Sequence, residues 1–226
     1  MDTTAFSSRE SAFVEFVLRY GMGTNRTFRS RILTGRTLNA VSKVTARMVR
    51  DEVLSRHDFL PPEVCFRLGA GAARVLGLPS RVTQPLGPQR LPVDFATLEY
   101  ATQGSPARRR LSATDIEDYL PWMPEELRQS PYCLDATGRL ELIRVDLGGS
   151  PQHIARKVAN AAHARLSVPK IAELAARSLF HVVVLTSTSE KATQIAKVMA
   201  DADFAPGTRV HFAVVPQLAR LLLCRR

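Results

Sequence analysis

Apolar residues recur at helical spacing through the first fifty residues of the chain. Between Phe13 and Tyr20 they follow an i, i+3, i+4, i+7 pattern, which predicts a helix with one buried face. Ser7 followed by Glu10 fits a capping box at the start of this helix, and Gly21 is a suitable terminator. The sequence therefore begins with a capped amphipathic helix.

Two more helices are predicted after Gly21. Thr24 is a suitable N-cap for a short helix that extends to Leu33, and Gly35 ends it. The third helix covers residues 36–50. Its apolar side consists of Leu38, Val41, Val44 and Met48.

The opposite side of this third helix is polar and cationic. It is made of Arg36, Asn39, Lys43, Arg47 and Arg50. No Asp or Glu occurs between Glu15 and Asp51, so the positive potential is not neutralised locally. We interpret the segment as a DNA-recognition helix, and a solvated basic face of an ordinary amphipathic helix is the alternative.

A short hairpin is predicted after the basic helix. Residues 53–59 and 64–68 are extended candidates, and the consecutive prolines Pro61 and Pro62 between them exclude both a helix and a central strand. This pattern is typical of a β wing. Arg56 and His57 on its first strand are candidates for phosphate contacts, although either residue also suits an ordinary surface.

Residues 66–78, FRLGAGAARVLGL, predict a strand that leads into a helix of small residues. The order of two helices, a basic helix, a proline-tipped hairpin and this element resembles the N-terminal winged-helix domain of the bacterial plasmid replication-relaxation and mobilisation protein family. The resemblance covers about residues 5–80. It implies a winged helix-turn-helix that binds DNA, followed by a domain similar to the restriction-endonuclease fold.

Proline and glycine are concentrated at residues 79–92, and this composition predicts a boundary. We assign residues 1–80 to the winged-helix domain, 81–92 to a linker and 93–226 to the second domain. Residues 104–110 are predicted to form a flexible basic loop, and the acidic residues around Pro121 to lie on turns. From Leu140 onward, apolar strands alternate with helices, which predicts an α/β layer with a partly parallel sheet and an α+β class for the whole chain.

The resemblance implies a metal-dependent nuclease centre in the second domain, for which the candidates are Asp135, Glu141, Asp146 and Lys157. Two departures from the family pattern oppose this function. Tyr132 stands where an aspartate is expected, and Arg144 places a permanent cation where an anionic ligand is expected. We expect Arg144 to pair with Asp146 instead. The sequence therefore predicts a degenerate centre with no catalytic residue, metal or cofactor, and nuclease activity is kept as the alternative.

A second basic surface is predicted on the helix at residues 150–166. Arg156 and Lys157 are its main candidates, and the resemblance implies a lysine at the second position. His163 and Arg165 extend this surface. The five histidines show no pairing in the sequence, and no residues fit a Ser-His-Asp arrangement.

The charge balance favours a polyanionic partner. Lys and Arg number 31 against 21 Asp and Glu, which gives a net charge of +10. No run approaches the ~18 apolar residues of a membrane span, and we expect a cytoplasmic protein without a membrane partner. Cys65, Cys133 and Cys224 are widely spaced and predict free thiols rather than a metal site.

These features predict a non-enzymatic accessory protein of plasmid mobilisation or replication that binds double-stranded DNA at a specific site. A transcriptional repressor and a protein-assembly module are alternatives that the same residues allow. Other DNA-processing proteins and a second copy of the chain are further partners compatible with the sequence. The predicted DNA contacts are Arg36, Asn39, Lys43, Arg47, Arg50, Arg56, Arg156 and Lys157.

Overall fold

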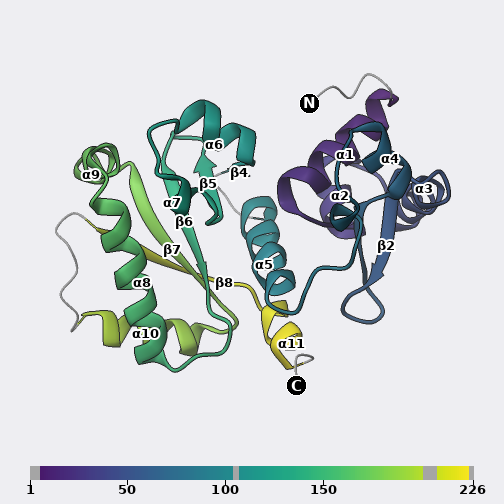
Figure 1. Cartoon of the computed structure of the whole chain (residues 1–226). Helices are drawn as coiled ribbons and strands as arrows, with labels where there is room; N and C mark the ends of the chain where they lie inside the picture. The colour runs from purple at the N-terminus through teal and green to yellow at the C-terminus, as the bar shows by residue number, and fades with distance from the viewer. Residues whose placement is uncertain (1–5, 104–106, 201–207, 224–226) are drawn as a thin grey trace. The chain divides into compact units, whose positions relative to one another are not determined.

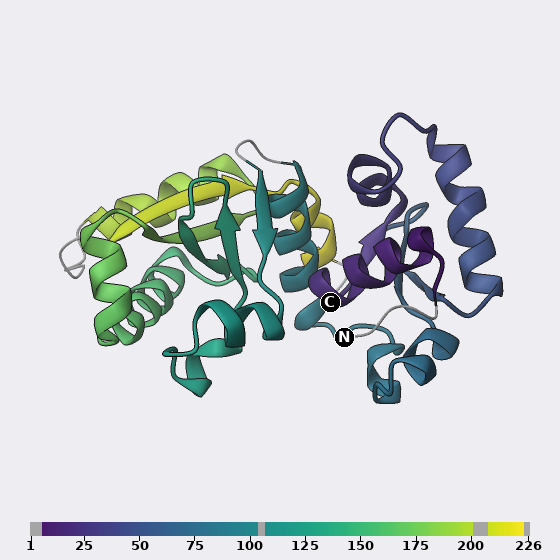
Figure 2. The ribbon, with the colours of Figure 1, turned by 90° about the horizontal axis from the view of Figure 1, so that it is seen from above.

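The computed structural model describes residues 6–103, 107–200 and 208–223 (Figures 1 and 2). Helices and strands are mixed along the chain, as expected for the α+β class. The chain forms two compact units, Met1–Leu98 and Glu99–Arg226. The division falls inside helix α5 (Arg90–Gln103), later in the chain than the proline-rich segment.

The three helices predicted for the first unit are confirmed. They are α1 (Ser8–Tyr20), α2 (Asn25–Arg31) and α3 (Leu38–Arg50). The Ser7 hydroxyl accepts a hydrogen bond from the Glu10 N–H, and the Glu10 carboxylate accepts one from the Ser7 N–H at 2.9 Å, so both parts of the predicted capping box are present. Gly21 ends α1 in the left-handed conformation at φ 78°.

A small antiparallel sheet accompanies these helices. It contains β1 (Gly23–Thr24), β2 (Leu54–Asp58) and β3 (Val64–Leu68), in the order β1-β3-β2. The predicted hairpin is confirmed as β2 and β3. Strand β1 was not expected, because two residues carry no detectable periodicity and depend on β3 for their pairing.

Phe28 forms the centre of the first unit's core. Its fully buried ring lies 4.5 Å from the ring of Phe13, 5.4 Å from that of Phe16 and 5.8 Å from that of Phe66, measured between centroids. A Cβ atom at Gly23 would lie 2.3 Å from the Phe28 ring, so only glycine fits there. Phe28 thus joins α1, α2 and β3 through one side chain.

Arg67 fastens the proline-rich segment to β3. Its buried guanidinium donates to the carbonyl oxygen of Gly21 at 3.2 Å and to those of Arg81 and Gln84. Ser55 adds a hydrogen bond to the Thr83 carbonyl at 3.2 Å. The start of the segment for which the composition predicts a linker is therefore held against the first unit. It follows α4 (Ala70–Val75) and overlaps the short helix η1 (Ser80–Val82).

The second unit contains a five-stranded sheet in the order β4-β5-β6-β7-β8. Strands β6, β7 and β8 are parallel, and β4 and β5 are antiparallel to their neighbours, as predicted for a partly parallel sheet. The strands are β4 (Arg108–Arg110), β5 (Tyr132–Asp135), β6 (Leu140–Val145), β7 (Phe180–Thr186) and β8 (Arg209–Val214).

Helices cover one face of this sheet and bury an apolar core against it (Figure 1). The covering helices are α8 (Pro151–Leu166), α9 (Pro169–Ala176) and α10 (Ser189–Ala200). The unit also contains α6 (Ala113–Tyr119), α7 (Glu125–Arg128) and α11 (Gln217–Leu223). None of the helices in the described ranges combines the length and apolar character that a membrane crossing requires.

Two local predictions for the second unit are wrong. Residues 108–110, expected in a flexible loop, form β4 because β5 offers them a ladder of hydrogen bonds; residues 104–106 of that loop lie outside the described ranges. The acidic stretch, expected on turns, includes α6 with a capping box between Ser112 and Asp115. The strand depends on a partner distant in sequence, whereas the helix carries a local capping signal that the expectation of turns does not include.

Buried free thiols are confirmed for two of the three cysteines. Cys65 and Cys133 are buried and unbonded, and Cys224 lies outside the described residues. Burial raises the pKa of Cys65 to about 11 and that of Cys133 to about 12, so both remain protonated and unreactive at neutral pH.

Replacing Arg67 with leucine should destabilise the first unit by about 2–4 kcal/mol, because the carbonyl oxygens of Gly21, Arg81 and Gln84 would lose the buried guanidinium that joins them. Urea unfolding followed by far-UV circular dichroism measures this loss. Arg74→Ala, at an exposed arginine on α4, is the matched control and should change stability by less than about 0.5 kcal/mol. Equal stability of the Arg67→Leu variant and the parent would contradict the role of Arg67.

Candidate nucleic-acid interface

Helix α3 turns its predicted cationic side to solvent. The Thr37 hydroxyl caps the helix by accepting from the Ala40 N–H at 3.2 Å, and the side chains of Val41, Thr45 and Met48 are buried. The five predicted contact residues on the opposite side are exposed: Arg36, Asn39, Lys43, Arg47 and Arg50. Burial of one stripe therefore orients all five outward.

Thr45 links α3 to α2. Its hydroxyl lies 3.0 Å from the Asn25 side-chain oxygen and 3.1 Å from the Ser42 carbonyl oxygen. Because Thr45 is buried and Asn25 is the first residue of α2, this contact fixes the start of α2 against the middle of α3. This hydrogen bond therefore fixes the position of α2 relative to α3.

The charges on α3 are only partly neutralised. Arg47 lies 4.0 Å from the Asp51 carboxylate, and both side chains are half-exposed. Within the described residues, Arg36, Lys43 and Arg50 take part in no ion pair. These three side chains supply an uncompensated positive potential along the exposed side of the helix.

A hollow of about 360 Å³ lies between α3 and the tip of the hairpin. Its walls come from the start of α2, the first turns of α3 and residues 62–64 of the hairpin. At the rim, the Arg26 guanidinium pairs with the Glu63 carboxylate and so ties the hairpin tip to α2. No sequence pattern predicts this hollow, because its walls are assembled from three separate segments.

The hairpin strands contribute one exposed cation at neutral pH, since Arg67 on β3 is buried. Arg56 is exposed on β2. His57 is partly buried, and its Nε2 lies 2.9 Å from the Ser55 hydroxyl. Burial, assisted by the nearby Arg67 charge, lowers the pKa of His57 below its ordinary value, so His57 is neutral and unsuited to a phosphate contact.

Leu38 departs from its predicted place in the core. It is 44% exposed and lines the hollow. The reason is its position as the first residue of α3. Helical side chains lean toward the helix N-terminus, so the Leu38 side chain projects past the part of the core that covers Val41.

The second predicted basic surface lies on α8, in the other unit. Arg156 and Lys157 are exposed there, and Arg156 contacts His153 Nδ1 at 3.3 Å. Arg165 does not extend this surface, because it is buried and donates to the Tyr132 hydroxyl at 3.1 Å and to the Ser130 hydroxyl at 2.6 Å. It holds α8 to β5 instead.

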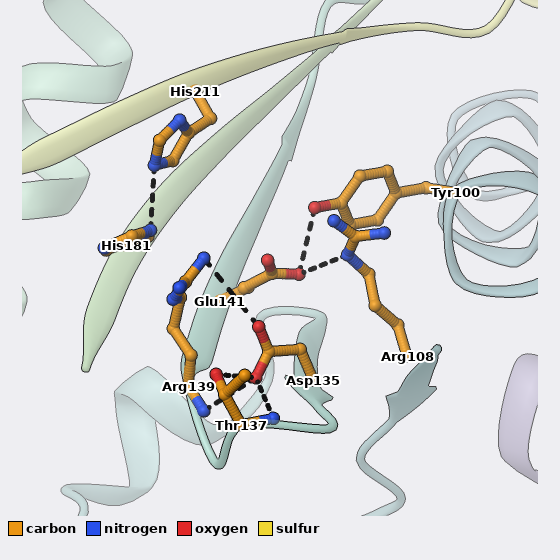
Figure 3. A network of polar contacts seen from close by, with 8 residues as sticks. All are labelled: Tyr100, Arg108, Asp135, Thr137, Arg139, Glu141, His181 and His211. Atoms are coloured by element: carbon orange, nitrogen blue, oxygen red, sulfur yellow. Dashed lines mark hydrogen bonds and ion pairs between the residues drawn. The ribbon is translucent and has the colours of Figure 1, made fainter. Parts of the chain in front are cut away.

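Two of the carboxylates considered for a nuclease centre, Asp135 and Glu141, are hydrogen-bonded by protein groups (Figure 3). Glu141 accepts from the Tyr100 hydroxyl and from Arg108, each at 3.0 Å. Asp135 accepts from the Thr137 hydroxyl at 2.6 Å and from the N–H groups of Thr137 and Arg139. Burial raises the pKa of Glu141, and the Arg108 charge opposes this shift.

The other two candidates for that centre are engaged elsewhere or exposed. The Asp146 carboxylate is buried and accepts from the Gly148 N–H at 2.8 Å, and Lys157 is on the solvent side of α8. Among the described residues, no group of three His, Cys, Asp or Glu side chains is arranged to hold a metal ion. The expected Arg144–Asp146 ion pair does not form in this part of the chain; Arg144 lies near Arg165 and Tyr132.

His181 and His211 form a hydrogen-bonded pair that no sequence pattern predicts. His181 Nδ1 and His211 Nε2 are 2.8 Å apart, joining β7 to β8 (Figure 3). The two residues are 30 positions apart in the sequence, so only the parallel pairing of the strands brings them together. Burial lowers the pKa of His181 to about 4, and the neighbouring His211, Arg139 and Arg209 add to this effect while Asp135 opposes it.

Comparison of the chain with models of protein families, with curated proteins and with solved structures gives no match.

The His181 environment should make the second unit less stable in mild acid. Because the folded-state pKa of about 4 is below the ordinary 6.5, the unfolded chain takes up the proton first, and stability is lost as pH falls from 6.5 toward 4. Urea unfolding at pH 7 and pH 5, followed by fluorescence of the single tryptophan Trp122, should show a smaller loss in His181→Asn than in the parent. The difference should be roughly 1–2 kcal/mol.

His163→Asn serves as the control for the pH experiment, since His163 is exposed on α8. It should lose as much stability as the parent between pH 7 and pH 5. If the His181→Asn variant loses as much stability as the parent between pH 7 and pH 5, His181 is not the group that causes the acid sensitivity.

Proposed function

We propose that this chain is a non-enzymatic accessory protein that binds double-stranded DNA at a specific site, and that its first unit reads the DNA. The observation that carries the proposal is the exposed side of α3, where Arg36, Lys43 and Arg50 are not neutralised and lie beside a hairpin. A protein helix and its polar side chains fit the major groove of B-DNA, and basic side chains supply affinity for phosphates.

The order of elements in the first unit supports a winged-helix assignment. Three helices, of which the third is basic, precede the β2–β3 hairpin, and β1 completes a small antiparallel sheet. In this assignment α3 enters the major groove and the hairpin acts as the wing. Asn39, Lys43 and Arg47 are then nearest the base edges, and Arg36, Arg50 and Arg56 contact phosphates.

For the second unit we propose a degenerate restriction-endonuclease-like domain that supports binding. The mixed five-stranded sheet with α8, α9 and α10 on one face is compatible with that architecture. The bonding of Glu141 to Arg108 and Tyr100 supports the absence of cleavage, because this carboxylate is already neutralised by protein groups. Arg156 and Lys157 would add phosphate contacts.

The resemblance to plasmid replication-relaxation and mobilisation proteins supplies the biological setting of this proposal. In such a setting, the protein would mark an origin-like DNA site for other DNA-processing proteins. A homodimer would recognise a repeated or palindromic site.

Binding to duplex DNA should weaken steeply with salt. Each neutralised phosphate contributes about −0.9 to the slope of log K against log salt concentration, so Arg50→Ala should make the slope shallower by about 0.9. Fluorescence anisotropy with a labelled duplex, measured between low and physiological salt, gives the slope. Arg177→Ala, which removes an exposed arginine from the second unit, is the control and should leave the slope unchanged.

A slope near zero for the parent protein would remove the electrostatic basis of the proposal. An unchanged slope in Arg50→Ala, together with a shallower slope in Arg156→Ala and Lys157→Ala, would assign the DNA-reading role to α8 instead of α3.

Supercoiled plasmid should remain intact when it is incubated with the protein and Mg²⁺ or Mn²⁺, because Glu141 accepts from Arg108 and Tyr100, and Asp135 accepts hydrogen bonds on Oδ1 and pairs through Oδ2 with Arg139 at 3.8 Å. Agarose gel electrophoresis separates nicked from supercoiled plasmid. Nicking that disappears in Glu141→Gln and persists in Glu173→Gln, at an exposed glutamate of α9, would replace the binding proposal with the nuclease alternative.

A further inference from the structure

Leu38 places an apolar group on the surface at the position where a recognition helix reads bases. It is the first residue of α3, it is 44% exposed, and its neighbours Arg36 and Asn39 are exposed polar residues. In helices that enter the major groove, residues of the N-terminal part contact the base edges. Leu38 therefore leaves 44% of its surface outside the protein's own core.

The hollow beside Leu38 has a mixed lining. Leu38, Pro62 and Val64 make its apolar part, and its polar part consists of Thr24, Asn25, Asn39 and Ser42 together with the paired Arg26 and Glu63. This combination suits the edge of a nucleobase, which carries hydrogen-bonding groups and, in thymine alone among the four DNA bases, a methyl group. A purely apolar hollow would have suited a protein side chain better.

The walls of the hollow are held in place by contacts away from Leu38. The Thr45 hydroxyl fixes Asn25 at 3.0 Å, and the Thr37 cap fixes the first turn of α3. The Arg26–Glu63 ion pair ties the hairpin tip to α2 and neutralises the only carboxylate among the residues that line the hollow. A base edge that enters therefore meets a preformed surface without an uncompensated negative charge.

We propose that Leu38 contacts the C5 methyl group of a thymine and that Asn39 faces an adenine in the neighbouring base pair. Leu38 and the apolar part of the hollow remove the methyl group from water, and the Asn39 amide matches the N6 and N7 groups of adenine. The inference rests on the proposed function, because it assumes that α3 enters the major groove. It adds the identity of the bases that this part of the helix selects.

The test compares thymine with uracil, which differ only by the methyl group. A duplex selected by the full-length protein is resynthesised with deoxyuridine at one thymine position at a time, and dissociation constants are measured by anisotropy. Loss of a buried methyl group should weaken binding of the parent about threefold to fivefold at one position. The Leu38→Ala variant should bind the thymine and uracil duplexes equally.

Two further variants, Leu38→Met and Val75→Ala, keep the test independent of folding, and a third, Asn39→Ala, tests the adenine contact. Leu38→Met retains an apolar side chain and should preserve part of the preference for thymine. Val75→Ala removes apolar surface at another exposed position of the first unit, where Val75 is 56% exposed, and should leave the preference unchanged. Asn39→Ala should no longer distinguish adenine from 7-deazaadenine, which lacks the N7 acceptor, at the neighbouring position.

Failure of this inference and failure of the proposed function give different results. Tight, salt-dependent binding that is insensitive to uracil at every thymine would overturn the role of Leu38 and leave the DNA-binding proposal intact. A thymine preference that persists in Leu38→Ala would assign the methyl contact to another residue. Absence of binding to any duplex would overturn the proposed function itself.

Discussion

The burial of one stripe of α3 is the constraint on which the exposed cationic surface depends. Val41, Thr45 and Met48 are almost completely removed from water, and their burial leaves the helix no freedom to rotate about its axis. The cations therefore point outward because the apolar residues point inward. The Thr45–Asn25 contact completes this constraint, since it fixes α2 against α3 with a buried polar bond whose loss would leave an unpaired group.

In the second unit, buried charged and polar side chains join neighbouring helices and strands. Glu141 and Arg108 form an ion pair with 3% and 13% of their side chains exposed, and Tyr100 satisfies the same carboxylate oxygen. Arg165 similarly connects α8 to Tyr132. Carboxylates held in this way stabilise the fold and are less able to bind a cation, because ligation would require breaking a desolvated pair. This is the physical reason for favouring a binding role over nuclease chemistry.

Much of the fold followed from local pattern and capping. The helix of residues 8–20 was predictable because its apolar period and the Ser7–Glu10 capping box agree, and strand Phe180–Thr186 because its continuous apolar run suits a strand buried on both faces. The exposed cations of α3 were also predictable, since the amphipathic pattern separates the two sides of a helix wherever that helix packs. The pairing of residues 108–110 with β5 was not, because a three-residue strand depends on its neighbour.

The sequence by itself determined the helices, the main strands and the basic character of α3. These are properties of residues close together in the chain, where periodicity and capping act. Only the tertiary structure decided that Leu38 is exposed, that Arg165 is buried, that His181 meets His211, and that a hollow opens between α2, α3 and the hairpin. Each of these depends on contacts between segments distant in sequence, and the burial and charge of a side chain are fixed by those neighbours rather than by its own chemical type.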